Sequence, residues 1–350
     1  MAALIKTDFK PAWWLPSPHL QTLWPALFRA PLNPPMIRER LTTPDHDFID
    51  LDWCGMTPQP LVILLHGLTG SSHSGYIKGM QQALLKQGWR SAVMNFLGCR
   101  EPNNRARCYH SGDTDDLHHL YLELKQREPD TPLSAVGYSL GGNVLLKWLG
   151  EQGKAVSLFA AAAVSVPFLL HVCANRMDRG LSRLYRNHLL RDLKQYIQRK
   201  RNHLEQHGLV LEAERLRRLG DLSTVRSFWE YDGRVIAGLY PFKDASDYYR
   251  QCSSRQYLNS IQVPTLLIHA VDDPFMTPAV IPQERELSPF IHLEITQEGG
   301  HVGFIAGTVP GQPDYWLERR IPHFLRQQLQ NNMHNTAVWS DTDASPTVAA

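Results

Sequence analysis

The chain of 350 residues contains few cysteines and little net charge of either sign. The cysteines are scattered, odd in number and include no C-x-x-C pair; they are Cys54, Cys99, Cys108, Cys173 and Cys252. This distribution fits neither a disulfide framework nor a zinc knuckle, so we expect the protein to work in a reducing compartment. A net charge of +2 is too small to indicate a nucleic-acid-binding protein, and we expect no nucleic-acid partner.

Long hydrophobic runs are missing as well. The longest, residues 156–170, is shorter than a bilayer requires and is interrupted by Ser157, Ser165 and Pro167. The first twenty residues contain no continuous apolar segment of the kind that secretory signals carry. We therefore expect a soluble, cytoplasmic protein. Residues 331–350 lack hydrophobic periodicity, which predicts a disordered tail.

Short apolar runs that alternate with helical patterns dominate the rest of the chain. Buried strands are predicted at 60–67, 91–96, 133–138, 158–165, 265–270 and 291–296, with helices such as 76–88 and 114–127 between them. This alternation is typical of an α/β protein with a mostly parallel sheet. Residues 37–53 alternate around a Pro-Asp turn and predict an antiparallel hairpin that precedes the sheet.

One segment, residues 167–255, interrupts the alternation with long polar helical patterns. We predict that it forms a helical cap over the carboxyl edge of the sheet, where open α/β sheets bind ligands. The α/β core is then expected at 10–166 and 256–330. Between Arg176 and Arg218 the cap holds 12 Lys or Arg against 5 Asp or Glu. Such a run is usually a solvated helix face, and the alternative is a surface that makes weak contact with anionic lipid.

The candidate nucleophile is Ser139, in the sequence Gly137-Tyr138-Ser139-Leu140-Gly141. This G-x-S-x-G motif follows a predicted strand and precedes a predicted helix, which is the context of a nucleophile elbow. The turn is tight enough that side chains at the flanking positions would collide, and the glycines relieve that crowding. The hydroxyl is thereby held above the sheet, near the positive end of the following helix.

A serine hydroxyl needs a base and an acid that orients the base, and the sequence offers both in the order Ser, Asp, His. The strand at 265–270 ends at Asp272 and Asp273, and His301 follows the last strand after two glycines. That position distinguishes His301 from the other histidines of the chain. The first strand of the parallel sheet runs into "HGLTGSS", so the N–H groups of Leu68 and Leu140 are the candidate oxyanion donors.

The acid-rich stretch "HSGDTDD" (110–116) raises the question of a metal site. It lacks the length and the terminal glutamate of an EF-hand loop. We expect it instead to cap the following helix, with Ser111 or Asp113 accepting backbone hydrogen bonds. No metal site is predicted anywhere in the chain.

Signature blocks of one known family extend over nearly the whole chain, roughly residues 10 to 325. They are "HLQT" (19–22), "NFLGCREPNNRARCYHSGDTDDL" (95–117), "GYSLGGN" (137–143), "DYYRQCSS" (247–254), "AVDDPF" (270–275) and "GGHVGF" (299–304). With these blocks the chain resembles α/β-hydrolase subfamily 4, the ABHD1, ABHD2 and ABHD3 type, and within it most nearly a bacterial esterase. The "YHSGDTDDL" block is far more specific than G-x-S-x-G alone.

The resemblance implies an α/β-hydrolase fold and a serine hydrolase that cleaves carboxylic esters, from short- and medium-chain acyl esters to lipids, without a cofactor. The catalytic residues it implies are Ser139, Asp273 and His301. Members of the fold usually carry the acid three residues beyond a small residue at the strand end, and Ala270 fills that place. Asp273 is therefore preferred, and Asp272 remains the alternative.

Two other functions are compatible with the same residues. In an acyltransferase, an alcohol instead of water would release the acyl group from the serine. A non-catalytic lipid or protein binder would keep the fold alone, and the presence of all three candidate catalytic residues argues against it.

Overall fold

The computed structural model describes residues 2–342, and the side chains of residues 2–334. Its centre is a nine-stranded sheet in the order β1-β9-β8-β7-β6-β4-β5-β3-β2. The strands are β1 (Ala3–Ile5), β2 (Ile37–Thr42), β3 (Phe48–Cys54), β4 (Leu61–Leu65), β5 (Arg90–Asn95), β6 (Leu133–Tyr138), β7 (Ala160–Val164), β8 (Thr265–Ala270) and β9 (Ile291–Thr296). All neighbours pair in parallel except β2 with β3 and β3 with β5. The predicted α/β-hydrolase fold, with its antiparallel hairpin, is confirmed.

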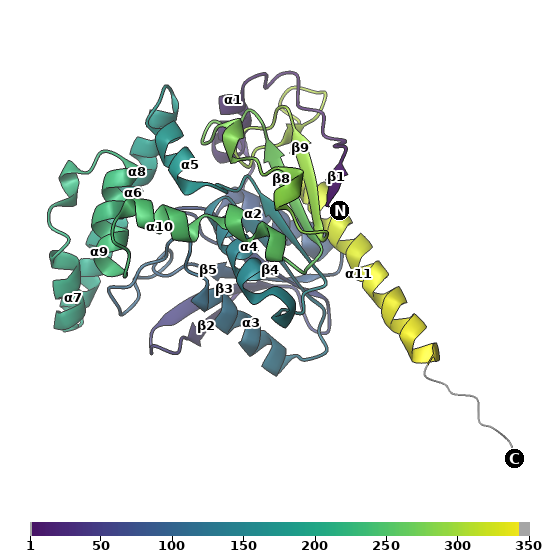
Figure 1. The fold of residues 1–350 in the computed structure, drawn as a ribbon, viewed down its shortest axis with the longest axis horizontal. Coiled ribbons are helices and arrows are strands. Elements are labelled where there is room, and N and C mark those ends of the chain that lie inside the picture. Colours follow the sequence, from purple (N-terminus) through teal and green to yellow (C-terminus); the bar gives the residue numbers. More distant parts are fainter. Residues whose placement is uncertain (1, 343–350) are drawn as a thin grey trace, which may run out of the picture.

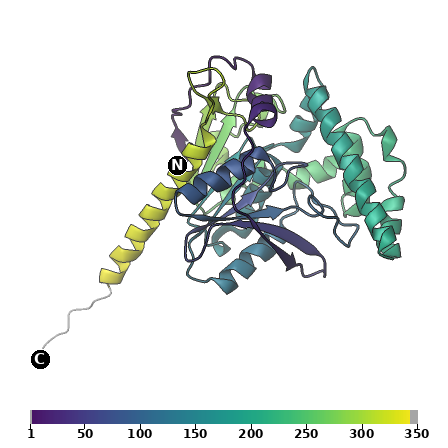
Figure 2. The same cartoon turned by 180° about the vertical axis from the view of Figure 1, so that it is seen from behind.

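The helices of the core cover both faces of this sheet. Helices α3 (Asp115–Arg127) and α4 (Leu140–Gln152) lie on one face, and α2 (Gly75–Lys86) and α11 (Leu317–Thr342) lie on the other (Figures 1 and 2). Successive residues of a strand point to opposite faces, so β4 contributes Ile63 to one hydrophobic core and Leu64 to the other. Burial on both faces explains why these strands are continuous apolar runs.

Two short sheet elements were not predicted. Strand β1 extends the sheet by pairing in parallel with β9, and β10 (Ile305–Ala306) pairs with β11 (Asp314–Tyr315) as a separate two-stranded ribbon. Elements of two or three residues are too short to show a hydrophobic period. The remaining core helix, α1 (Pro18–Phe28), lies close to the start of the cap (Figure 2).

The chain between β7 and β8 is helical and gathers on one side of the sheet (Figure 1). It contains α5 (Leu170–Met177), α6 (Ser182–Gln206), α7 (Val210–Arg217), α8 (Phe228–Tyr231), the π-helical turn η3 (Asp232–Ile236), α9 (Ala237–Leu239) and α10 (Ala245–Cys252). The remaining one-turn elements are 3₁₀ helices: η1 (Gly153–Ala155), η2 (Leu222–Thr224), η4 (Ser254–Ser260), η5 (Pro278–Val280) and η6 (Glu284–Glu286). We continue to treat residues 167–255 as the cap, and its boundaries stay a prediction.

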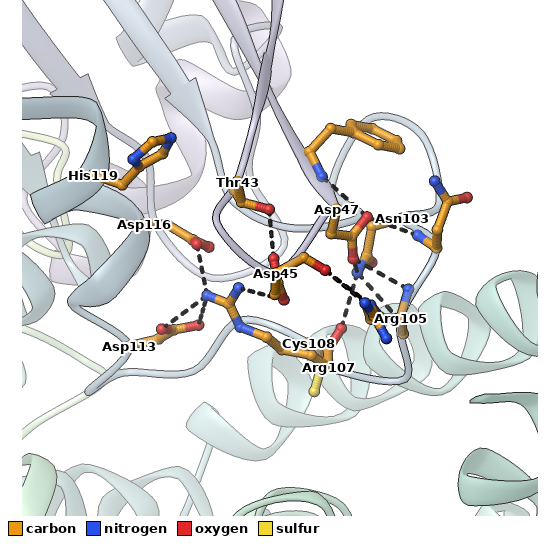
Figure 3. A network of polar contacts seen from close by, with 12 residues as sticks. Thr43, Asp45, Asp47, Asn103, Arg105, Arg107, Cys108, Asp113, Asp116 and His119 are labelled. Atoms are coloured by element: carbon orange, nitrogen blue, oxygen red, sulfur yellow. Dashed lines mark hydrogen bonds and ion pairs between the residues drawn. The ribbon is translucent and has the colours of Figure 1, made fainter. Parts of the chain in front are cut away.

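The predicted helix cap at "HSGDTDD" is wrong. The N-cap residue of α3 is Thr114, and its side chain makes no capping hydrogen bond. The carboxylate of Asp113 instead faces the guanidinium of Arg107, which also contacts Asp45 of the hairpin turn and Asp116 (Figure 3). A hydrogen bond between a carboxylate and a guanidinium is stronger than one between a carboxylate and a neutral backbone N–H. Asp113 therefore bonds Arg107 and does not cap the helix. The stretch therefore joins the hairpin to α3.

The loop that carries Arg107 also hydrogen-bonds to helices of the cap. The ammonium group of Lys200 on α6 donates to the carbonyl oxygen of Arg107, and Lys200 is fully buried. The N–H of Ala106 donates to Glu212 Oε2 on α7 at 2.7 Å. These two contacts connect the loop that carries the network of Figure 3 to helices α6 and α7 of the cap.

Helix α11 continues to Thr342. The prediction of a disordered tail is therefore wrong for residues 331–342, while residues 343–350 lie outside the described residues. The segment 331–342 contains no glycine or proline, so a helix whose first turns pack on the core can propagate through it. Within residues 2–342, none of the helices combines the length and apolar character needed to cross a bilayer.

Candidate active site

Ser139 lies between β6 and α4 with a strained backbone, at φ 51° and ψ −118°. Its N–H donates to Val164 O at 2.8 Å, which anchors the turn to the neighbouring strand. A Cβ at Gly137 would lie 2.5 Å from Gly141 O, and one at Gly141 would lie 2.5 Å from His66 O. Neither position can hold a side chain. The glycines of the motif are thus required by the close approach of backbone to backbone.

His301 lies on a loop that packs against α1. The Oγ1 of Thr22 accepts a hydrogen bond from His301 N at 2.9 Å, and a Cβ at Gly300 would lie 2.5 Å from Pro18 O. The side chain of Gln21 donates to Ile305 O at 3.1 Å and accepts from Ile305 N at 2.7 Å. The "HLQT" block therefore holds the histidine loop in place from the other end of the chain.

The structure brings Ser139, His301 and Asp273 together in one hydrogen-bonded chain. His301 Nε2 lies 2.9 Å from Ser139 Oγ, and His301 Nδ1 lies 2.8 Å from Asp273 Oδ2. A carboxylate at Nδ1 favours the tautomer with a proton there, which leaves Nε2 free to accept the serine proton. The second oxygen of Asp273 accepts the N–H of Phe275 at 2.8 Å, so both carboxylate oxygens have partners.

The neighbouring carboxylate, Asp272, does not contact the imidazole in this chain of bonds. Its Oδ1 accepts the N–H of Gly300 at 3.0 Å, and burial raises its pKa above the usual value. It supports the backbone of the histidine loop. The structure therefore places Asp273 next to His301 and gives Asp272 a supporting contact.

An aromatic stack that was not predicted covers the imidazole. The rings of Phe275 and His301 are parallel within 8° and their centroids are 4.0 Å apart. Tyr185 of α6 packs on Phe275 at 4.9 Å, and its hydroxyl lies 3.0 Å from His19 Nδ1 on α1. Phe275 and His19 belong to two blocks of the family resemblance, "AVDDPF" and "HLQT". Membership in these blocks was the only feature of the sequence that pointed to either residue.

Buried polar groups fix the backbone of the loop after β4. The His66 ring accepts Phe96 N at Nε2, 3.1 Å away, and its Nδ1 lies 2.8 Å from Gly67 O. Burial lowers the pKa of His66 to about 4, so the ring is neutral. The hydroxyl of Tyr76 accepts Gly67 N at 2.8 Å. These contacts fix the backbone on which Leu68 lies.

The N–H groups of Leu68 and Leu140 donate no hydrogen bond to any other described residue. Both residues line the same cavity as Ser139 and His301. Leu140 is the first residue of α4, so its N–H is at the positive end of the helix. Two unpaired donors beside a serine hydroxyl are what an oxyanion would require, and their role stays a prediction.

The cavity above Ser139 has a volume of about 540 Å³. The cap contributes mostly aliphatic and aromatic side chains to it, among them Leu170, Leu193, Phe228, Tyr231, Ile236 and Tyr249. A cavity of this size and character suits a small or medium-sized apolar ligand. In the described part of the chain, no three His, Cys, Asp or Glu side chains gather in a way that could hold a metal ion.

Comparison with known proteins gives matches along most of the chain. Residues 60–308 match the family model of the alpha/beta hydrolase fold. "Putative esterase YheT" of Escherichia coli (strain K12) is 43% identical over 317 residues, covering 89% of this chain and 91% of that protein. "Phospholipase ABHD3" of Mus musculus is 30% identical over 304 residues, covering 84% and 72%. The solved esterase Pf2001 of Pyrococcus furiosus shares the fold, with a TM-score of 0.55 at 19% identity over 93% of this chain and 99% of that chain.

Proposed function

The chain belongs to the α/β-hydrolase family as an esterase/lipase-type member, and we propose that it is a serine carboxylic ester hydrolase acting on short- to medium-chain acyl esters. One observation carries this proposal: Ser139, His301 and Asp273 form a continuous hydrogen-bonded chain at the floor of a largely apolar cavity. An isolated serine would not be nucleophilic, whereas a serine bonded to an oriented imidazole is.

In the proposed reaction, Ser139 Oγ attacks the acyl carbon of the ester while His301 Nε2 takes the serine proton. The N–H groups of Leu68 and Leu140 stabilise the negative charge that forms on the carbonyl oxygen. Asp273 stabilises the imidazolium, which then protonates the departing alkoxide. Water attacks the acyl enzyme by the same route, and the acid leaves with Ser139 restored. No cofactor takes part.

Two observations support the substrate class. The most similar relatives described above carry the names esterase and phospholipase, which are ester-cleaving activities. The cavity of about 540 Å³ is large enough for a medium-length acyl chain and is mostly apolar on its cap side. Small-molecule and lipid esters both fit this description.

The test compares Ser139→Ala with the wild-type protein on p-nitrophenyl butyrate. We expect turnover to fall by several orders of magnitude, about 10⁶-fold in the best-studied serine hydrolases, because the covalent path is lost. Ser157→Ala, at an exposed serine outside the cavity, is the matched control and should keep wild-type activity. A fluorophosphonate probe should label the wild-type and control proteins and leave Ser139→Ala unlabelled. Retained turnover or labelling in Ser139→Ala would disprove the proposal.

We also propose that the basic face of the cap makes weak contact with an anionic membrane surface. Arg179, Arg183 and Arg199 are exposed and form no ion pair with any described residue. Exposed, unpaired cations on the surface of the cap attract anionic lipid. Co-sedimentation with phosphatidylserine vesicles at low salt, and release at high salt, would support this contact. Absence of binding at low salt would exclude it.

A further inference from the structure

The roof of the cavity contains one carboxyl group that the proposed ester chemistry does not use. Asp232 is the first residue of the π-helical turn η3, and it lines the same cavity as Ser139 and His301. Turns of π-helix are rare and occur frequently at functional sites. Asp232 therefore lies where its carboxyl group can contact a ligand in the cavity.

Asp232 has one partner in the protein. Its Oδ2 accepts a hydrogen bond from the hydroxyl of Tyr249 at 2.6 Å. Within residues 2–334, its Oδ1 accepts no hydrogen bond and no Lys, Arg or His forms an ion pair with it. Asp273, by contrast, has partners on both oxygens. One oxygen of this cavity-lining residue is thus free to accept a further hydrogen bond.

Burial in this apolar roof penalises the charged form of Asp232. It raises the pKa of the carboxyl to about 7, although the hydrogen bond from Tyr249 acts in the opposite direction. A leucine would fill the same space without this cost. Beside it, Tyr231 also lines the cavity, and its hydroxyl makes no hydrogen bond with a described residue. Asp232 Oδ1 and the hydroxyl of Tyr231 therefore both lack a hydrogen-bond partner among the described residues.

We propose that Asp232 accepts a hydrogen bond from a hydroxyl group of the substrate, and that this contact makes the enzyme prefer hydroxylated esters. The inference rests on the proposed function, because the ligand is the ester that Ser139 cleaves. A hydroxyl group both donates and accepts, so it can bond Asp232 in either protonation state and Tyr231 as well. An ammonium group would bond only the ionised carboxylate.

The hydroxyl could belong to the acyl chain or to the alcohol part of the ester, and two pairs of substrates separate these sources. The first pair is the p-nitrophenyl ester of hexanoic acid and that of its terminal hydroxy derivative. The second pair is the propyl and the dihydroxypropyl ester of hexanoic acid. The ratio of kcat/KM within each pair isolates the contribution of the hydroxyl group.

We expect the wild-type protein to favour the hydroxylated member of one pair by at least about tenfold, the effect of one hydrogen bond to a carboxyl group. Asp232→Leu should remove this preference, bringing the ratio of kcat/KM within that pair close to one. Asp221→Asn, at an exposed aspartate of the cap outside the cavity, is the control and should keep the preference. If Asp232→Leu does not fold, Asp232→Ala and the wild-type ratios still decide.

Three results would overturn the inference. The wild-type protein could show no preference in either pair, the preference could survive Asp232→Leu, or an amine-bearing ester could be cleaved better than the hydroxylated one. In each case Ser139→Ala would still be inactive, so the esterase proposal would stand. If Ser139→Ala hydrolysed esters at the wild-type rate, the proposed function itself would fall.

Discussion

The floor and the roof of the cavity are built in different ways. On the floor, Ser139, His301 and Asp273 come from the ends of strands and hydrogen-bond to one another. The roof comes from helices of the cap and is mostly apolar, with Asp232 bonded only to Tyr249. The three side chains of the floor thus satisfy each other without a ligand, whereas the roof contains a carboxyl oxygen that a ligand would satisfy.

The difference follows from how each part is held. Residues that follow β6 and β8 inherit their positions from the ladder of the sheet, which tolerates little displacement. Residues of the roof are positioned by helix packing, which can vary without affecting the sheet. We therefore expect changes on the floor to act on the chemical step, and changes in the roof to act on the choice of substrate.

The largest effect should separate the two adjacent carboxylates at the end of β8. Asp273→Asn keeps the volume but removes the charge that stabilises the imidazolium, and it should lower kcat about 10⁴-fold, as in serine proteases. Asp272→Asn should lower kcat only about tenfold, because it weakens the bond to Gly300 N that supports the histidine loop. Steady-state kinetics on p-nitrophenyl butyrate would measure both kcat values, and circular dichroism would check that both variants fold. A larger loss in Asp272→Asn would reverse the assignment of the acid.

A bulky side chain in the roof should change chain-length preference. Leu189 of α6 lines the cavity and is half-buried, so Leu189→Trp should fill part of the space for the acyl chain. We expect kcat/KM for a decanoyl ester to fall on the order of tenfold to a hundredfold, and that for an acetyl ester to change little. Leu184→Trp, at an exposed position of the same helix, is the control. Equal losses on both esters would contradict the division between floor and roof.

The stacked ring on the imidazole should have a smaller effect, and on kcat alone. Phe275→Leu keeps an apolar side chain but removes the parallel ring that restricts His301. Because such a stack is worth about 1 kcal/mol, we expect kcat to fall about fivefold to tenfold with KM unchanged. Phe275→Tyr keeps the ring and should restore kcat. A change in KM without one in kcat would show that Phe275 contacts substrate instead.

The smallest expected effect is on the free energy of unfolding and concerns Lys200, which attaches α6 of the cap to the loop at Arg107. Burial lowers the pKa of Lys200 from 10.5 to about 8, against the opposing effects of Cys108, Asp47 and Cys99. Between these two values the unfolded chain holds a proton that the folded chain has released, so the free energy of unfolding rises with pH. Lys200→Met lacks this titration. The stability of the wild type relative to the variant should therefore rise by about 1–2 kcal/mol between pH 7.5 and 9.5.

Urea unfolding of both proteins at the two pH values measures this difference. Cys99 and Cys108 are present in both proteins, so taking the difference cancels most of the contribution of their thiols. A constant difference between the two pH values would show that Lys200 does not titrate in this window.

The sequence contains local signals for the floor residues, whose catalytic roles stay a prediction, and no such signal for Asp232 in the roof, for a physical reason. Ser139, Asp273 and His301 each follow a strand, and a buried parallel strand is a strong local signal. Asp232 lies in a turn of π-helix within the cap, and no sequence motif there distinguishes its carboxylate from the other acidic residues of the cap. The stack of His19, Tyr185 and Phe275 joins three distant segments. No local pattern can predict such a contact. The charge network of Arg107 was misread for the same reason, since Asp45 is remote in sequence.

The contact between Thr22 and His301 joins residues 279 positions apart. On the ribosome α1 is made before the loop after β9, so Thr22 cannot bond His301 until that loop has emerged. The same loop carries His301, which is the proposed base. A nascent or prematurely terminated chain can already display the serine turn and still lack the group that activates it. On the proposed mechanism, hydrolytic activity is therefore acquired only after His301 has been added, so chains that stop before this residue would not cleave esters.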